Sequence, residues 1–205
     1  MYKKLHILLI ISILVVTKLL IYIQHMHNLP TIFAKYLEIC KHFSNDLVNE
    51  AGNITRRGVV PKFSDLQVIA LSLTAETLSI DSENNLFNRL TEYKASFPNM
   101  ISRRQFNDRR KSTSHLCETI RKRIADIIDG VENYFCIDSK PIEVCRVSRG
   151  KRCKMGHKSY SASPSFSYCA SQGVYYYGYK LHALCGLSGV IHSYDLTQAG
   201  VHGFD

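Results

Sequence analysis

A chain of 205 residues in which 45% are hydrophobic and 21% are charged has the composition of a globular protein, which excludes a wholly disordered chain. The formal net charge is +9, and residues 102–158 hold 15 of the 26 Lys and Arg residues but 7 of the 17 Asp and Glu residues. Such a basic stretch attracts polyanions such as nucleic acid, although a solvated basic face has the same composition.

The cysteines give two expectations about chemistry. There are 7 of them with no Cys-x-x-Cys pair, and an odd number without paired spacing argues against a disulfide framework and for a reducing compartment. A zinc site built from Cys145, Cys153, His157 and Cys169 is disfavoured, because structural zinc ligands usually come in close pairs.

Residues 1–28 form a hydrophobic N-terminal extension, in which LHILLIISILVVTKLLIY at 5–22 follows the basic pair Lys3-Lys4. Read literally, this is a signal anchor, but it barely reaches the roughly 20 residues that cross a bilayer. We favour a misplaced start codon, with the natural start at Met26 and a cytoplasmic protein. A protein anchored in the membrane through residues 5–22 is the alternative.

Residues 29–130 are predicted to be helical. Apolar residues recur at spacings of three and four over 30–48, as on an amphipathic helix. A second helix is expected to begin at Ser64–Gln67, which matches a capping box, and a third at Asp81 or Ser82.

A further capping box, Ser102–Gln105, leads into one long basic helix that reads FNDRRKSTSHLCETIRKRIADII. Short helices followed by a helix that begins with Arg and Asn favour a helix-turn-helix-like DNA-binding region, because Arg reads guanine edges or phosphates and Asn reads adenine. A solvated helix that packs through Phe106 is the alternative. The candidate DNA contacts in this region are Arg56, Arg57, Arg103, Arg104, Asn107, Arg109, Arg110 and Lys111.

Residues 131–205 are predicted to contain strands. The segment 134–144 has the β-branched and aromatic residues of a strand, and Pro141 marks an edge or an end of the sheet. The basic segment 146–167 is expected to be a loop, and 174–185 and 190–197 to form a hairpin. Helices followed by strands predict an α+β or α/β chain with a helical domain first.

Asp138 lies in the middle of the first predicted strand, where strand alternation places a core residue. Burying an unpaired charge costs several kcal/mol, so such a carboxylate needs a metal, a cationic partner or exposure at a strand end. The candidate cationic partners are Lys140 and Lys180. A structural Asp that pairs with one of them and a metal ligand are both compatible with these residues.

Several linked blocks of the chain resemble the DDE transposases of bacterial insertion sequences. They are YFCIDSKPIEVC at 134–145, YGYKLH at 177–182 and DLTQA at 195–199. The segments RRG at 56–58, PKFSDLQVIALSLTAE at 61–76 and SRRQFNDRRK at 102–111 are similar to the front half of the same family.

This resemblance implies an RNase H-like domain in which two Asp and one Glu hold two Mg²⁺ or Mn²⁺ ions for phosphodiester cleavage and strand transfer. Asp138 matches the first Asp, and would be both catalytic and a metal ligand. The expected partner is DNA carrying the terminal inverted repeats of the element, and a homodimer is a further expectation. Candidate DNA contacts in this domain are Arg149, Lys151, Arg152, Lys154, Lys180 and His182.

The chain departs from the family after residue 199. The family places its second Asp in a later Asp-Lys-Gly-Tyr block and its Glu on a helix beyond, and Asp195 lies too early to be that second Asp. We therefore expect a C-terminally truncated copy whose active site is incomplete, and the alternative is a non-catalytic remnant that binds element ends. An incomplete sheet is also expected to expose apolar surface.

Overall fold

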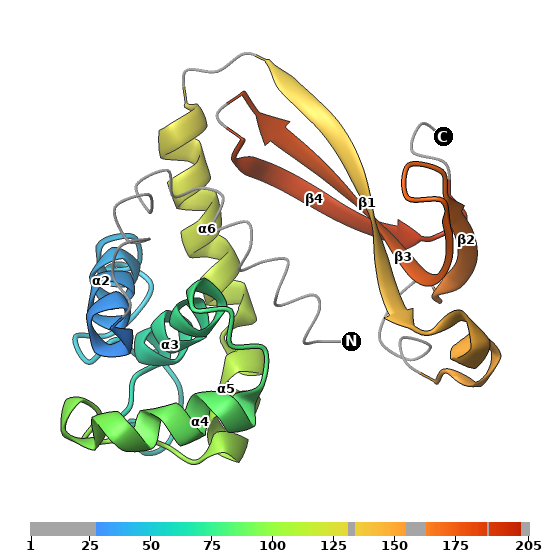
Figure 1. The fold of residues 1–205 in the computed structure, drawn as a ribbon. Coiled ribbons are helices and arrows are strands. Elements are labelled where there is room, and N and C mark those ends of the chain that lie inside the picture. Colours follow the sequence, from blue (N-terminus) through green and yellow to red (C-terminus); the bar gives the residue numbers. More distant parts are fainter. Residues whose placement is uncertain (1–27, 131–133, 155–162, 188, 202–205) are drawn as a thin grey trace. The chain divides into compact units, whose positions relative to one another are not determined.

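A computed structural model describes residues 28–130, 134–154, 163–187 and 189–201 of the chain. The chain divides into two compact units, with the division between Ile127 and Ile128. The helices lie in the first unit, here called the helical unit, and the strands lie in the second, the sheet unit (Figure 1). The predicted mixture of helices followed by strands is confirmed.

The helical unit is built around the helix α3 (Asp65–Thr77), in which every residue from Asp65 to Ala75 except Gln67 is buried. A helix that is apolar on all sides belongs in the middle of a core rather than on its surface. The helix α2 (Leu29–His42) packs against it, and the Tyr36 hydroxyl lies 2.6 Å from the Thr77 hydroxyl. Burial raises the pKa of Tyr36 to about 12, which keeps this hydroxyl protonated.

The amino end of α3 is held by a buried carboxylate. The capping box expected at Ser64 is present, since its hydroxyl accepts from Gln67 N and its own N–H donates to Gln67 Oε1. The next residue, Asp65, is fully buried, accepts a hydrogen bond from Ile54 N at 3.0 Å, and pairs with Arg109 at 2.6 Å. Burial lowers the pKa of the Arg109 guanidinium. Asp65 thus joins the loop before α3 to a helix far along the chain.

The described residues form three more α-helices, α4 (Glu83–Leu90), α5 (Arg103–Ser112) and α6 (Ser114–Asp129), and a short 3-10 helix at Thr91–Ser96. The capping box expected at Ser102 is present. The single long helix predicted after it is wrong, because Thr113 separates α5 from α6 and is itself buried with its hydroxyl bonded to Arg109 O. The first helix is also shorter than the predicted 30–48, since Ser44 bonds back to Cys40 O and turns follow.

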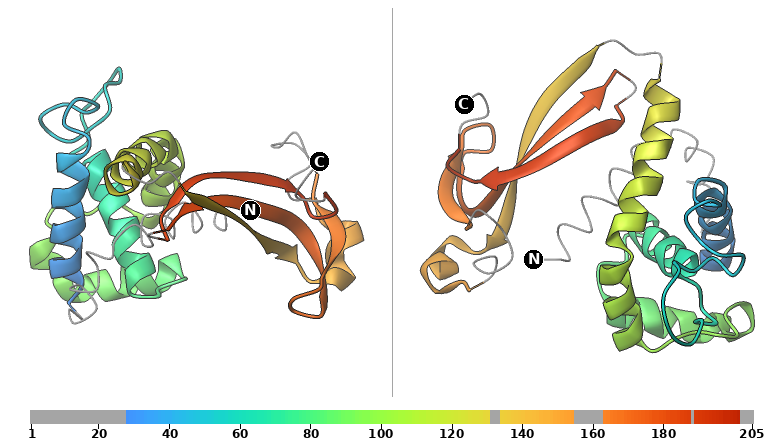
Figure 2. Two further views of the ribbon diagram at one scale, coloured as in Figure 1. Left: turned by 90° about the horizontal axis from the view of Figure 1, so that it is seen from above. Right: turned by 180° about the vertical axis from the view of Figure 1, so that it is seen from behind.

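The sheet unit contains four antiparallel strands, β1 (Phe135–Cys145), β2 (Ser165–Cys169), β3 (Val174–Gly186) and β4 (Ile191–Gln198). The long strand β3 lies in the centre, with β1 along one side and with β2 and β4 along the other. Figure 2 shows β1, β3 and β4 side by side as a twisted ribbon. β1 is therefore an edge strand, which is where Pro141 is tolerated because it donates no ladder hydrogen bond.

Part of the segment predicted as a loop is ordered secondary structure. A 3-10 helix, η3 (Val147–Arg152), follows β1 directly, and β2 pairs with the first residues of β3. In Ser165–Cys169 the Ser residues alternate with Phe and Tyr as in a half-buried strand, but the surrounding segment is rich in Ser, which favours a loop. Among the described residues, no helix is long and apolar enough to cross a membrane, and the apolar segment 5–22 lies outside the described ranges.

Replacing Asp65 tests its importance for the helical unit. The variant Asp65→Ala leaves Arg109 beside the core without its partner, and we expect the free energy of unfolding to fall by about 3–5 kcal/mol. Urea denaturation followed by circular dichroism measures this loss. The control is Arg104→Ala, at a side chain that is 93% exposed, where a change below about 0.5 kcal/mol is expected. Equal stability of the two variants would show that the Asp65 cluster contributes little.

Candidate nucleic-acid interface

Asp138 lies in the middle of β1 and is exposed, in contrast to the core position that strand alternation suggested. It is paired in register with Ala183 on β3, and its carboxylate accepts a hydrogen bond from Ser139 N at 2.7 Å. Among the described residues it makes no ion pair. The expectation of a buried carboxylate is therefore wrong, because the part of β1 around it is exposed on both sides.

The register places Asp138 and Lys180 on opposite faces of the sheet, whereas Lys140, two residues along β1, shares the face of Asp138. Residues in direct register share a face and adjacent residues alternate, so Asp138 shares a face with Ala183, whereas Lys180 and His182 lie on the other. Lys180 instead donates to Val201 O at 2.8 Å, and His182 Nε2 lies 2.9 Å from the Thr197 hydroxyl. The proposed Asp138–Lys180 pairing is therefore contradicted by the sheet.

The same register bears on metal binding. Asp195 is paired with His182, and so lies on the face opposite Asp138. Within the described ranges, no group of three or more His, Cys, Asp or Glu side chains is placed to hold a metal ion. The donors around Asp138 that the structure describes do not fit a two-metal centre, because a single carboxylate supplies too few oxygen ligands.

The basic residues of α5 divide between an outer and an inner face. Arg104, Asn107 and Lys111 recur at the helical spacing, and Arg104 is 93% exposed. The inner face carries Arg109, bound to Asp65, and Arg110, which pairs with Glu83 at 3.2 Å.

The inner arginines of α5 thus have structural partners, and their contact with DNA stays a prediction. Arg103 at the start of α5 is exposed and bonds to Asn84 Oδ1 at 2.6 Å. In the loop before α3, Arg56 also pairs with Asp65, and Arg57 is exposed. The connection between α4 and α5, residues 91–102, exceeds the about three to four residues of a helix-turn-helix turn.

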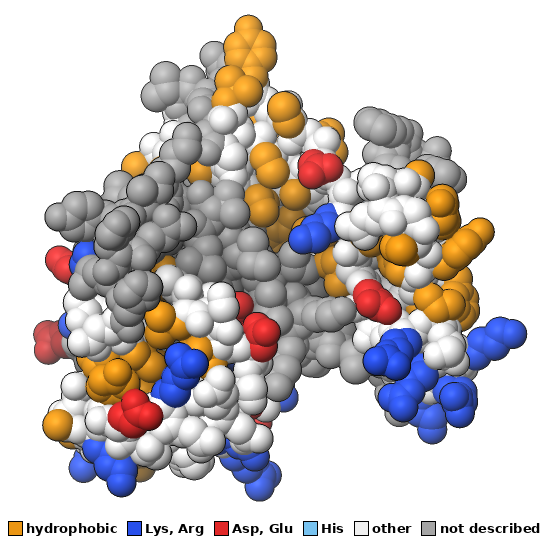
Figure 3. Space-filling view, in the orientation of Figure 1, with side chains coloured by type: hydrophobic (Ala, Val, Ile, Leu, Met, Phe, Trp, Pro, Cys, Tyr) orange, Lys and Arg blue, Asp and Glu red, His pale blue; other side chains and the backbone are white. Residues whose placement is uncertain are grey.

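The basic segment after β1 brings several predicted contacts together. It covers residues 146–154, contains no Asp or Glu, and has no buried cation. Figure 3 shows a group of Lys and Arg side chains on the part of the molecule that carries the sheet. The exposed cations of this basic segment are Arg146, Arg149, Lys151, Arg152 and Lys154.

A glycine fixes this segment against the sheet. Gly150 is buried in η3, and a Cβ at this position would lie 2.5 Å from Phe166 Cζ and 2.9 Å from Tyr177 Cδ2. The backbone of η3 therefore approaches both rings more closely than any other residue type allows. Sequence reasoning found the cations, but it did not find the aromatic side chains that support them.

The thiols near this segment do not assemble the disfavoured zinc site among the described residues. Cys145 hydrogen-bonds with Cys153, and burial raises the pKa of Cys145. Cys169 instead lies 3.3 Å from the Ser171 hydroxyl, whose hydrogen bond lowers the pKa of Cys169. His157 lies outside the described ranges.

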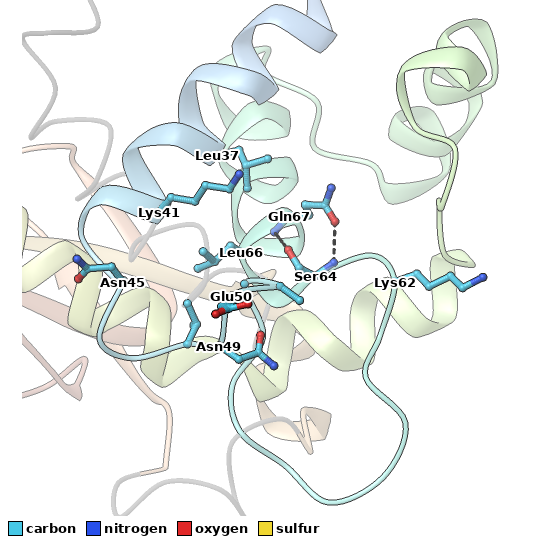
Figure 4. A pocket seen from close by; sticks show the side chains of 12 residues that line it. Leu37, Lys41, Asn45, Asn49, Glu50, Lys62, Ser64, Leu66 and Gln67 are labelled. Carbon is cyan, nitrogen blue, oxygen red and sulfur yellow. Dashed lines mark hydrogen bonds between the residues drawn. The ribbon is translucent and has the colours of Figure 1, made fainter.

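The helical unit also has an open pocket of about 700 Å³ between the end of α2 and the start of α3 (Figure 4). Its wall includes Lys41 and Glu50, and the Ser64–Gln67 capping box closes one side. Because the polar groups at the start of α3 already bond to each other, the pocket has no cluster of side chains that points to chemistry.

The mixed α+β architecture agrees with a sequence comparison. Residues 129–205 match the family described as the transposase DDE domain, a range that contains the whole described sheet unit from β1 onwards. These residues are similar to that family. No curated protein and no solved structure matches the chain.

Thiol labelling checks the geometry around the basic segment. At neutral pH we expect iodoacetamide to alkylate Cys169 faster than Cys145, because a lowered pKa gives more thiolate. Buried Cys40 and Cys117 should stay unlabelled, since burial raises both pKa values, that of Cys117 to about 12. Peptide mass spectrometry at timed quenches measures the rates, and the guanidinium-unfolded chain is the control. Faster labelling of Cys145 than of Cys169 would contradict the described contacts.

Proposed function

We propose that the chain is an insertion-sequence transposase chain that binds the terminal inverted repeats of its element. The observation that carries this proposal is the basic segment 146–154, which lies within the transposase DDE domain match and exposes every one of its cations. Lys and Arg that neutralise phosphates release condensed counterions, and this release drives much of the binding to DNA.

The outer face of α5 supports a second part of the proposal, recognition of sequence. Arg104, Asn107 and Lys111 lie on one helical stripe on which Arg104 and Lys111 are exposed and Asn107 is half-buried, and these residue types hydrogen-bond guanine, adenine and phosphate. Arg109 and Phe106 on the inner side hold the helix to the core, so the stripe is presented on a rigid element. We assign α5 to the reading of bases and the basic segment to phosphate contact.

The strand arrangement supports an RNase H-like domain over residues 131–205. Its first strands are expected to carry the first catalytic Asp in the middle of a strand, and β1 carries Asp138 in that place, with β3 beside it and β4 on the far side of β3.

Binding without cleavage is the function that the described residues favour. Asp138 has no second carboxylate on its own face among the described ladder partners, and Asp195 lies on the other face. We therefore propose that the described part of the chain supplies at most one metal ligand and acts through DNA binding.

Charge removal tests the phosphate contacts. We expect the triple variant Arg149→Gln/Lys151→Gln/Arg152→Gln to bind element-end duplex more weakly. The slope of log affinity against log salt should fall by about 3, roughly one for each lost phosphate contact. Fluorescence anisotropy at several salt concentrations measures this slope. The control variant Lys41→Gln/Lys62→Gln/Lys94→Gln removes the same charge from the helical unit, and equal losses for both would argue for unspecific attraction.

Base reading by α5 is tested separately. The variant Arg104→Ala/Asn107→Ala should reduce the preference for element-end duplex over random duplex by about tenfold, since a good base contact contributes roughly 1–3 kcal/mol of discrimination. Competition binding measures the preference, and Arg89→Ala is the control outside α5. An unchanged preference would remove α5 from the recognition surface.

A cleavage assay tests the restriction to binding. We expect the full chain to leave element-end duplex intact in the presence of Mg²⁺ or Mn²⁺, as measured on a denaturing gel. Specific nicking by the chain that disappears in Asp138→Ala would overturn the proposal and establish catalysis.

A further inference from the structure

Two pairs of aromatic rings lie next to each other at the start of β3. Phe166 is in register with Tyr177, and Tyr168 with Tyr175, so the two pairs share one face of the β2–β3 ladder. The ring centroids are 4.6 Å apart in the first pair and 4.8 Å apart in the second. These contacts fix the rings at the orientation in which the ladder presents them.

The outer pair is open to solvent. Tyr175 is 73% exposed and Tyr168 is 51% exposed, whereas Tyr177 in the inner pair is 5% exposed. Phe166 is 46% exposed between the outer pair and η3. A contiguous set of exposed aromatic rings on an ordered ladder is a feature of binding surfaces rather than of ordinary solvated faces.

The basic segment borders these rings directly. Gly150 packs on Phe166 and Tyr177, and its neighbours Arg149 and Lys151 are exposed cations. The surface therefore combines flat apolar rings with a dense group of positive charges. We call it the aromatic–basic surface, and it consists of Arg149, Lys151, Arg152, Phe166, Tyr168 and Tyr175.

We propose that the aromatic–basic surface binds single-stranded DNA, with unpaired bases stacked on Tyr168 and Tyr175 and phosphates held by the cations of η3. This proposal rests on the DNA-binding function proposed above and adds to it the state of the DNA. Base–aromatic stacking needs bases that have left the duplex stack, and cations that follow the backbone complete such sites. An apolar protein partner would match the rings but would leave the cations without a counterpart.

The aromatic–basic surface lies at the end of β3 that is far from the partner of Asp138. Tyr175 lies on the same face of β3 as Ala183, the residue in register with Asp138. The two positions on β3 are about 26 Å apart at about 3.3 Å per residue. Between them on this face Tyr179 is 1% exposed and Leu181 is 6% exposed, so the aromatic–basic surface is a separate site at one end of β3.

Anisotropy with the full chain tests the proposal. The probes are a labelled single strand of about 15 nucleotides, within the range that one such site covers, and a duplex of the same sequence. We expect Tyr168→Ser/Tyr175→Ser to weaken single-strand binding by about tenfold and duplex binding by less than about twofold. Only unpaired bases can stack on these rings, so the variant loses a contact that the duplex never makes. Tyr168→Phe/Tyr175→Phe should bind as the unmodified chain does, since the rings remain.

The control variant is Tyr134→Ser, which removes a ring that is 74% exposed in the same unit but outside this surface. Matching thermal melts show that the variants are folded. Unchanged single-strand affinity in the serine variant overturns the inference while duplex binding still supports the proposed function. If the serine variant no longer self-associates but binds DNA as before, the surface binds a second copy of the chain, and the inference is overturned. Absence of binding to both probes overturns the inference and the proposed function together.

Discussion

The buried carboxylate of Asp65 is the interaction on which the helical unit depends. It lies at the first residue of the central helix, accepts from the backbone of the preceding loop, and pairs with Arg109 from α5. A buried charge of this kind is tolerated only when its oxygens are fully satisfied. The loop, the start of α3 and the orientation of α5 are consequently fixed by one group, and the outward stripe of α5 follows from the inward direction of Arg109.

Local signals predicted the starts of helices better than their ends. The capping boxes at Ser64 and Ser102 were read correctly, because each depends only on side chains a few residues apart. The break at Thr113 was missed, since neither Gly nor Pro marks it and the buried hydroxyl bonded to Arg109 O is a local backbone contact without a sequence signature. Short β2 was missed because its residues lie in a Ser-rich segment that favours a loop, although it forms a hairpin with β3 in which Cys169 pairs with Val174.

The candidate site was predictable in composition but not in geometry. The sequence identified Asp138 and the cations of the basic segment, because their residue types carry the chemistry. It did not determine which face of the sheet each side chain lies on, since a shift of one residue in the register of a strand moves every side chain of that strand to the other face. The separation of Asp138 from Lys180, and the contact of Gly150 with Phe166, became visible only with the ladder.

A β-bulge between Glu143 and Cys145 determines on which face of the sheet the basic segment lies relative to Asp138. Gly178 and Tyr177 are adjacent on β3, but their partners on β1 are Glu143 and Cys145, which are two residues apart. Val144 is therefore an extra residue in β1. This extra residue reverses the odd–even parity of β1, and Cys145 reaches the face that also carries Asp138. Deleting Val144 would restore an even count and turn η3 toward the opposite face, away from the aromatic rings. The single extra residue in β1 therefore keeps the basic segment and Asp138 on the same face of the sheet.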